Sequence, residues 1–383
     1  MTTWTLECSA CDVLLGGAQL ASVCPGCGQP LLVRYALTVI DRAVLRHTWD
    51  MWRYASLLPL CDWETPVTLG EGGTPLLESP VLAKALGVRR LWIKDEGLNP
   101  TGSFKARGMS AAVTRAKALG VSGLVVPTAG NAGAALAAYG AAAGLPVRVF
   151  APETTPSPIL RTIAALGAEL VTVPGHIGDA GRRARESAAE SGYFDMSTLR
   201  EPYRIEGKKT MGLELAEQLD WTLPDAIIYP TGGGTGLIGM WKGFAELREV
   251  GWLSADQPMP RMITAQAQGC APIVRAFENG ADRAAPWPNP ETHASGLRVP
   301  GPLGDRLILL ALRESGGDAA AVDEHTIRAA TRELAITSGI DAAPEGGCAL
   351  GVCRLLVKQG RLARDSSVLL FNTGSGASYR FDD

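Results

Sequence analysis

The sequence predicts an α/β fold with two open, largely parallel, doubly wound sheets and a small cysteine-bearing ribbon at the N-terminus. From residue 88 onward, apolar strand-like runs alternate with helical patterns, as in stacked β-α units. Glycine-rich loops follow several expected strands, at the sheet edge where open α/β folds bind ligands. Two Cys-x2-Cys pairs lie within the first 27 residues.

The two cysteine pairs predict a zinc ribbon over residues 1–36. The start MTTWTLECSA has no basic segment followed by an apolar one, so we expect no secretory signal and a cytoplasmic location. Disulfides are rare in such a compartment, and paired thiolates at this spacing favour tetrahedral Zn²⁺. The alternative is a ribbon that keeps its shape without metal. The expected ligands are Cys8, Cys11, Cys24 and Cys27.

The β-α alternation assigns an element to most of the chain. After the ribbon, residues 31–37 are expected to be extended and residues 42–60 helical. The later expected strands cover residues 91–94, 123–128, 147–152, 169–174, 225–230, 262–267 and 366–374. The expected helices cover residues 108–119, 132–143, 159–166, 179–191, 208–218, 237–250, 326–338 and 347–359. A proline-rich loop is expected near Trp287.

Charge and hydropathy exclude two classes of partner. Acidic residues number 39 and basic residues 36, without long like-charge runs, so we expect no nucleic-acid partner. Residues 118–147 form 30 consecutive uncharged positions, which is long enough to span a bilayer. Six glycines and two prolines interrupt this stretch, so it predicts a strand, a loop and a helix, and we expect no membrane association.

Lys105 is the first candidate catalytic residue. It follows the turn Pro100-Thr101-Gly102-Ser103 and the apolar Phe104, just before an alanine-rich helical pattern. Near a helix N-terminus and partly removed from water, a lysine loses its preference for the charged form. A neutral amine can form a Schiff base with an aldehyde such as that of pyridoxal phosphate. The alternative is an exposed lysine in a first turn.

The loop PTGGGTGLIG, residues 230–239, is a candidate phosphate site. Its glycines let successive backbone N–H groups converge on one anion at the start of a helix. The spacing also matches the Gly-x-Gly-x-x-Gly dinucleotide pattern, but the next expected strand ends without the acidic residue that this pattern requires. We therefore favour a single phosphate monoester over a dinucleotide or a structural turn.

Two further loops end expected strands. Thr128-Ala129-Gly130-Asn131 could receive a carboxylate or a phenolic oxygen, although Asn131 could instead cap the following helix. The motif NTGSG, residues 372–376, ends the last expected strand and places Thr373 and Ser375 at a sheet edge, where a hydroxyl could meet a ring nitrogen.

Taken in order, these motifs resemble the tryptophan-synthase-β-like group of pyridoxal-phosphate enzymes, known as fold type II. Within that group the chain looks like the threonine synthases over nearly its whole length. The blocks that carry the resemblance are CSACD, CPGCGQPLLVRY, EGGTPLLESP, KDEGLNPTGSFKARGMSAAV, EPYRIEGKKTMGLELAEQLDW, YPTGGGTGLIGMWKGF, QAQGCAPIVRAFENG, ASGLRVPGPLGDRLIL, ALRESGG and FNTGSG.

The resemblance assigns roles to the motif residues. Lys105 would be the Schiff-base lysine and the general base, Phe104 would pack against the cofactor ring, Asn131 would bind its phenolic oxygen and Thr373 would face its ring nitrogen. The cofactor phosphate would lie on the loop formed by Gly232, Gly233, Gly234, Thr235 and Gly236. The substrate carboxylate would be received by Thr128, Ala129, Gly130 and Asn131. Arg204 would bind the substrate phosphate, because a guanidinium can contact it with two N–H groups.

The resemblance implies a lyase that converts O-phospho-L-homoserine and water to L-threonine and phosphate. It also implies a homodimer and a cofactor between two domains: a large one over residues 37–110 and 205–383, and a smaller mobile one over residues 111–204. Glu153 stands where relatives tend to carry a lysine, and an acidic group lining the site would disfavour a phosphorylated substrate. The alternatives are a threonine or serine dehydratase, a β- or γ-replacement enzyme of the same fold type, or a binding protein that has lost the chemistry.

Overall fold

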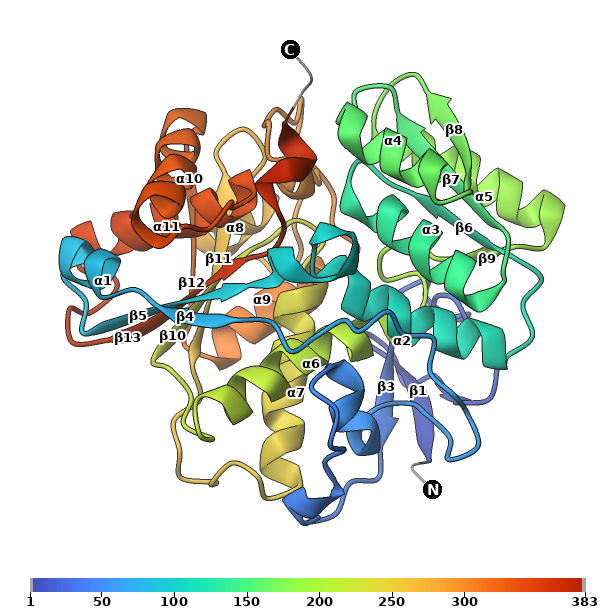
Figure 1. Cartoon of the computed structure of the whole chain (residues 1–383), viewed down its shortest axis with the longest axis horizontal. Coiled ribbons are helices and arrows are strands. Elements are labelled where there is room, and N and C mark those ends of the chain that lie inside the picture. Colours follow the sequence, from blue (N-terminus) through green and yellow to red (C-terminus); the bar gives the residue numbers. More distant parts are fainter. Residues whose placement is uncertain (1–2, 381–383) are drawn as a thin grey trace.

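The computed structural model describes residues 3–380 and contains three sheets (Figure 1). The first two residues of the expected ribbon and the last three of the expected large domain lie outside the described residues. The N-terminal sheet is antiparallel, in the order β2-β1-β3, with β1 at Trp4–Cys8, β2 at Leu14–Gly16 and β3 at Leu31–Tyr35.

The six-stranded sheet forms the centre of the larger half of the molecule. All neighbouring strands are parallel except the edge strand β4, which is antiparallel to β5. The order is β12-β11-β10-β13-β5-β4, with β4 at Leu76–Glu78, β5 at Arg90–Asp95, β10 at Ala226–Pro230, β11 at Arg261–Ala267, β12 at Asp318–Val322 and β13 at Ser367–Asn372. Both faces are buried: Ile227 and Leu369 pack with α6, α7 and α9, whereas the next residue of each strand packs with α10 and α11.

The four-stranded sheet is parallel throughout and lies in the other half of the molecule, together with α3, α4 and α5 (Figure 1). Its order is β8-β7-β6-β9, with β6 at Leu124–Pro127, β7 at Val147–Pro152, β8 at Glu169–Val173 and β9 at Phe194–Asp195. The ribbon does not have a core of its own, because Leu6 and Val33 belong to the same apolar cluster as α2, α3 and β6.

Eleven α-helices occur within residues 3–380. They are α1 Pro80–Leu86, α2 Lys105–Ala118, α3 Asn131–Ala143, α4 Ser157–Ala165, α5 Ile177–Ser191, α6 Tyr203–Gln218, α7 Thr235–Glu249, α8 Pro272–Glu278, α9 Asp305–Glu314, α10 Glu324–Ser338 and α11 Pro344–Lys358. The 3₁₀ turns are η1 Arg42–Val44, η2 Met51–Leu57, η3 Glu96–Leu98, η4 Pro100–Gly102, η5 Ser295–Leu297 and η6 Gly376–Tyr379.

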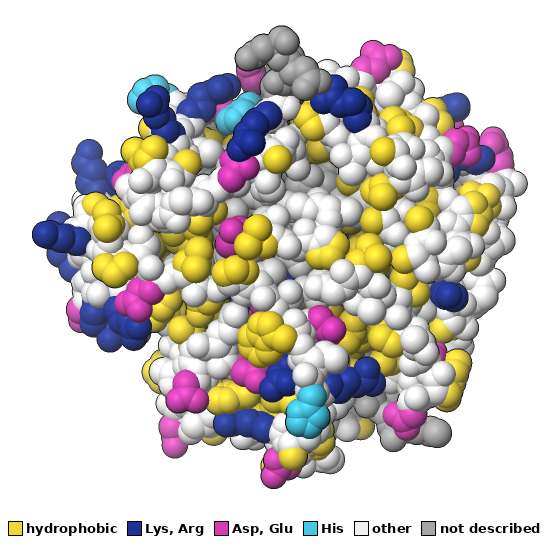
Figure 2. All heavy atoms as spheres, viewed as in Figure 1, with side chains coloured by type: hydrophobic (Ala, Val, Ile, Leu, Met, Phe, Trp, Pro, Cys, Tyr) yellow, Lys and Arg dark blue, Asp and Glu magenta, His cyan; other side chains and the backbone are white. Residues whose placement is uncertain are grey.

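The predicted α/β class with parallel sheets is confirmed, and residues 118–147 form the strand, loop and helix that were expected. No helix in the described part of the chain combines the length and apolar character needed to cross a bilayer. On the face drawn in Figure 2, acidic and basic side chains are interspersed, as the nearly balanced composition suggests.

Two parts of the prediction were wrong. Residues 42–60 are not one helix but the separate turns η1 and η2, because Asp41 and Asp50 cap short turns and the backbone of Tyr54 leaves the helical region. Elements α1, α8, α9, β4, β9 and β12 and the ribbon strands β1 and β2 were missed. Three of these, α8, α9 and β12, lie between the expected strand at 262–267 and the expected helix at 326–338, around the expected proline-rich loop.

Candidate functional site

A cavity of about 400 Å³ lies at the carboxyl ends of β6, β10 and β13, where the two parallel sheets meet. Every residue predicted from the sequence to bind cofactor or substrate lines it. These residues are Phe104, Lys105, Thr128, Ala129, Gly130, Asn131, Arg204, Gly232, Gly233, Gly234, Thr235, Gly236 and Thr373. The structure therefore brings together segments that lie far apart in the sequence, while the role of each residue stays a prediction.

A tight turn places Lys105 in the cavity. Thr101 and Gly102 both have left-handed backbones, with φ of 61° and 69°, so the chain reverses sharply before α2. The Phe104 N–H donates to the Thr373 carbonyl at 3.1 Å, which joins this turn to the end of β13. Helix α2 begins at Lys105, three residues earlier than predicted, and so the lysine occupies its first turn.

The amine of Lys105 is poised to be neutral. The residue is half-buried because it lines the cavity, and its Nζ lies 3.9 Å from the ring centroid of Phe104. Burial, and then the positive charge of Arg204, lower the pKa of Lys105 to about 7, against the raising effect of Glu345. A neutral amine is a nucleophile toward an aldehyde and a base toward an acidic C–H.

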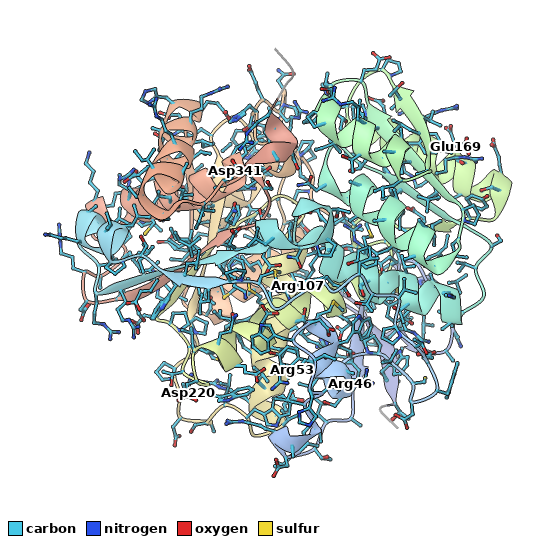
Figure 3. The ribbon with its side chains drawn as sticks, in the orientation of Figure 1. Arg46, Arg53, Arg107, Glu169, Asp220 and Asp341 are labelled. Atoms are coloured by element: carbon cyan, nitrogen blue, oxygen red, sulfur yellow. The ribbon has the colours of Figure 1, made fainter. Side chains whose placement is uncertain are left out.

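A buried ionic cluster behind the cavity holds the start of α2 in place. Arg107, labelled in Figure 3, donates to Glu96 at 2.7 Å and to Glu214 on α6 at 2.9 Å, and all three side chains are at most 2% exposed. Although burial opposes ionisation, the charge of Arg107 lowers the pKa of both carboxyl groups. The cluster therefore ties η3, α2 and α6 together next to Lys105.

The glycine loop between β10 and α7 has the form of a phosphate cradle. Gly234 has φ of 78°, and α7 starts at the next residue; Thr235 and Gly236, whose N–H groups have no partner within the helix, line the cavity. A Cβ at Gly232 would lie 2.1 Å from the Gly296 carbonyl oxygen, and one at Gly236 would lie 2.0 Å from the Tyr229 Oη. Side chains are thus excluded from both ends of the loop.

The loop before α3 is arranged by its own threonine. Thr128 Oγ1 donates to the Gly130 carbonyl at 2.6 Å and accepts from the N–H of Gly133 at 3.2 Å. Asn131 is the first residue of α3, and Gly130 is the cap, so the capping alternative for Asn131 does not hold. A Cβ at Gly374 would lie 3.2 Å from the Asn131 Nδ2, which shows how closely α3 approaches the end of β13.

Arg204 lies in the first turn of α6, which starts five residues earlier than predicted because the Glu201 carboxylate accepts the N–H groups of Tyr203 and Arg204. Its Nη1 donates to the Met196 carbonyl at 2.8 Å, and its buried Nε has no hydrogen-bond partner within the described residues. Burial lowers the pKa of Arg204.

Sequence reasoning missed several cavity residues. Arg200 and Arg298 add positive charge, and Glu345 is the one carboxylate among the described lining residues. Glu345 accepts the Gly296 N–H at 2.8 Å and contacts the Tyr379 hydroxyl, which in turn lies 2.9 Å from Ser295 Oγ. No signal in the sequence pointed to Glu345, because the expected helix began at residue 347 whereas α11 begins at Pro344 and includes Glu345 in its first turn.

The four ribbon cysteines also come together. Their sulfur atoms all lie within 4.8 Å of one another, and the Cys8–Cys27 and Cys11–Cys24 separations are 3.4 and 3.6 Å. A tetrahedral ion with Zn–S bonds of about 2.3 Å would set such separations at about 3.8 Å. The donor set and its geometry therefore fit zinc.

Known proteins match most of this chain. The model of the pyridoxal-phosphate dependent enzyme family covers residues 67–374. The threonine synthase of Methanosarcina acetivorans is 37% identical over 374 residues, 96% of this chain and 91% of that protein. The threonine synthase of Methanocaldococcus jannaschii is 37% identical over 339 residues, 88% of this chain and 83% of that protein. The threonine synthase of Mycobacterium tuberculosis is 34% identical over 324 residues, 84% of this chain and 86% of that protein.

Solved structures give the same fold. Maize serine racemase superposes with a TM-score of 0.68 at 22% identity, covering 79% of this chain and 88% of that one. The T.th. threonine deaminase superposes with a TM-score of 0.63 at 28% identity, covering 81% of this chain and 93% of that one. The predicted resemblance is confirmed, and the chain belongs to the family of pyridoxal-phosphate dependent enzymes.

Proposed function

We propose that the protein is a threonine synthase, which converts O-phospho-L-homoserine and water to L-threonine and phosphate. The observation that carries this proposal is the surplus of arginines over carboxylates among the described lining residues of a cavity whose glycine loop would hold one phosphate. With Lys105 neutral, three arginines and one carboxylate, that of Glu345, line the cavity within the described residues. A substrate that carries its own phosphate would use that surplus, whereas serine or threonine would not.

Two further observations support a phosphorylated substrate. Glu153 is exposed and does not line the cavity, so its acidic side chain does not oppose a phosphate there. The relatives at 37% identity over most of the chain are threonine synthases.

The cavity residues would have separate roles in the reaction. Bound pyridoxal phosphate supplies a conjugated ring that takes up the negative charge of the substrate carbon. Lys105 Nζ, with a pKa of about 7, would act as general base at Cα and later at Cβ. Arg204 would bind the substrate phosphate, and the loop of residues 128–131 its carboxylate. Phe104 and Thr373 would orient the cofactor ring, and the glycine loop would hold its phosphate.

The test is to incubate cofactor-loaded protein with O-phospho-L-homoserine and to follow threonine and phosphate together. We expect equal, catalytic release of both from the wild type and none from Lys105→Ala. If amino acids shift the cofactor's visible absorption band while no phosphate appears, the protein is another enzyme of this family. Serine, threonine and their O-activated forms would then be screened as substrates.

We also propose a structural Zn²⁺ on Cys8, Cys11, Cys24 and Cys27, supported by the sulfur separations. Residues 111–204 are proposed as the mobile smaller domain, since the four-stranded sheet falls entirely within them. A homodimer and a cytoplasmic location stay predictions that rest on the resemblance and on the sequence.

A further inference from the structure

The segment that carries two arginines of the cavity does not have a relaxed backbone. Residues 198–204, here called the arginine segment, include Arg200 and Arg204 and precede or begin α6. Leu199 has a left-handed backbone, with φ of 62°, although it is a branched residue and is buried. Such a conformation costs free energy and persists only where the surrounding structure holds it.

Part of that support comes from hydrogen bonds within the arginine segment and from one to Met196, two residues before it. Glu201 accepts the N–H groups at the start of α6, and Arg204 donates to the Met196 carbonyl. These bonds fix the helix start, but they leave the carbonyl of Arg200 and the hydroxyl of Tyr203 to be satisfied from elsewhere.

Further support comes from the ribbon, 178 and 186 residues earlier in the chain. Ser22 Oγ donates to the Arg200 carbonyl at 2.6 Å, and Tyr203 Oη donates to the Gly17 carbonyl at 3.1 Å. Gly17 and Ser22 belong to residues 17–22, here called the ribbon loop, which connect β2 to the second cysteine pair.

The ribbon loop is itself fixed. Gly17 is buried, and a Cβ there would lie 2.3 Å from the Trp4 Nε1, so the loop lies directly against the Trp4 indole. The Arg115 guanidinium lies 4.8 Å from the Trp4 ring and 5.7 Å from the Tyr203 ring, which links ribbon, α2 and α6 in one packed contact. Cys11 and Cys24 bracket the loop, so gathering the four sulfurs also closes it.

We infer that the ribbon loop is a positioning element for the arginine segment. The ribbon thereby sets the affinity of the cavity for a second anion, in addition to the phosphate of the cofactor. The inference rests on the proposed function in one respect, that this anion is the substrate phosphate. Cofactor binding would be spared, since among residues 3–380 no hydrogen bond joins the ribbon loop to the glycine loop or to Lys105.

The experiment compares two sets of variants of the cofactor-loaded enzyme. The double variant Ser22→Ala/Tyr203→Phe removes the donors of both hydrogen bonds between the ribbon loop and the arginine segment. The single variant Ser22→Thr keeps a hydroxyl at position 22 and the wild-type Tyr203. Gln29→Ala is the matched control, because it removes another ribbon–body hydrogen bond, from Arg283 Nη1 at 2.8 Å, far from the arginine segment in the sequence. The readouts are the affinity for inorganic phosphate, KM and kcat for O-phospho-L-homoserine, the cofactor band, and amide hydrogen exchange in residues 196–206.

For the double variant we expect phosphate affinity to fall and KM to rise by about tenfold, as two lost hydrogen bonds predict. The value of kcat and the cofactor band should be unchanged, exchange in residues 196–206 should be faster, and Ser22→Thr and Gln29→Ala should match the wild type. Unchanged exchange together with unchanged phosphate affinity would overturn the inference, as would an equal effect of Gln29→Ala. If the wild type neither binds phosphate nor acts on O-phospho-L-homoserine, the proposed function fails, and the exchange comparison still decides the positioning role.

Discussion

Two regions of one cavity would, on the proposed function, bind anions in different ways. The glycine loop, residues 232–236, would use backbone N–H groups between a strand and a helix that follow each other in sequence. The arginine segment would use side chains; its backbone has a left-handed residue at Leu199, and the segment is hydrogen-bonded to the distant ribbon. On the proposed function, the cofactor phosphate site is coded locally, whereas the proposed substrate phosphate site depends on contacts across the molecule.

The largest effect is expected from a substitution in the glycine loop, and it concerns the affinity for the cofactor. Gly232→Ala would place a Cβ 2.1 Å from the Gly296 carbonyl oxygen, so the cradle must shift, and affinity for pyridoxal phosphate should fall by roughly 100-fold. Absorbance titration of the apoprotein measures this. Gly301→Ala is the control, because Gly301 also lines the cavity but its added Cβ would meet nothing within 4 Å. Equal losses in both variants would mean that the glycine loop has no special role.

The next effect is expected at the arginine segment. Arg204→Gln should raise KM for O-phospho-L-homoserine by about 10- to 100-fold, because a charge-assisted, two-point contact is lost. Arg204→Lys should give an intermediate KM, since lysine keeps the positive charge but lacks the paired N–H donors of the guanidinium. Steady-state kinetics and a cofactor titration, with thermal unfolding as a check on folding, separate the two regions. A loss of cofactor affinity with unchanged KM would place Arg204 on the cofactor instead.

A pH dependence distinguishes Lys105 from both anion-binding regions. Its lowered pKa of about 7 means that the amine becomes neutral as pH rises through 7, so capture of pyridoxal phosphate by the apoprotein should speed up roughly tenfold per pH unit below 7 and level off above. Stopped-flow absorbance measures this rate. A rate still rising between pH 8 and 10 would show an ordinary lysine. Phosphate binding is a poor probe here, because burial also raises the pKa of Glu201, beside Arg204, to about 7.

The smallest effect on the cofactor is expected from the ribbon. Removing the proposed zinc with a chelator should lower the unfolding temperature of the N-terminal region and weaken phosphate binding, while the cofactor band stays. Metal analysis, calorimetry and absorbance measure the three quantities. Loss of the cofactor band together with zinc would show that the ribbon supports the whole cavity rather than the arginine segment alone.

The fold was predictable wherever local pattern and tertiary role agree. Strands such as 226–230 are apolar and β-branched, and both faces of their sheet are buried, so composition and structure coincide. Strand β12, with the sequence DAAAV, has no such composition. It is extended because Ile263 and its neighbours in β11 pair with it in parallel register.

The sequence by itself determined the residues that end strands or start helices: Lys105 in its turn, the glycine loop, the loop before α3, Thr373 and the four cysteines. Each depends on conformational rules that act over a few residues, so spacing is enough to find it. Only the tertiary structure decided that Arg200, Glu345 and Tyr379 share the cavity, and that the ribbon contacts the arginine segment. These contacts join segments tens to hundreds of residues apart, and only the packing of the sheets and the ribbon's shared core brings them within hydrogen-bond distance.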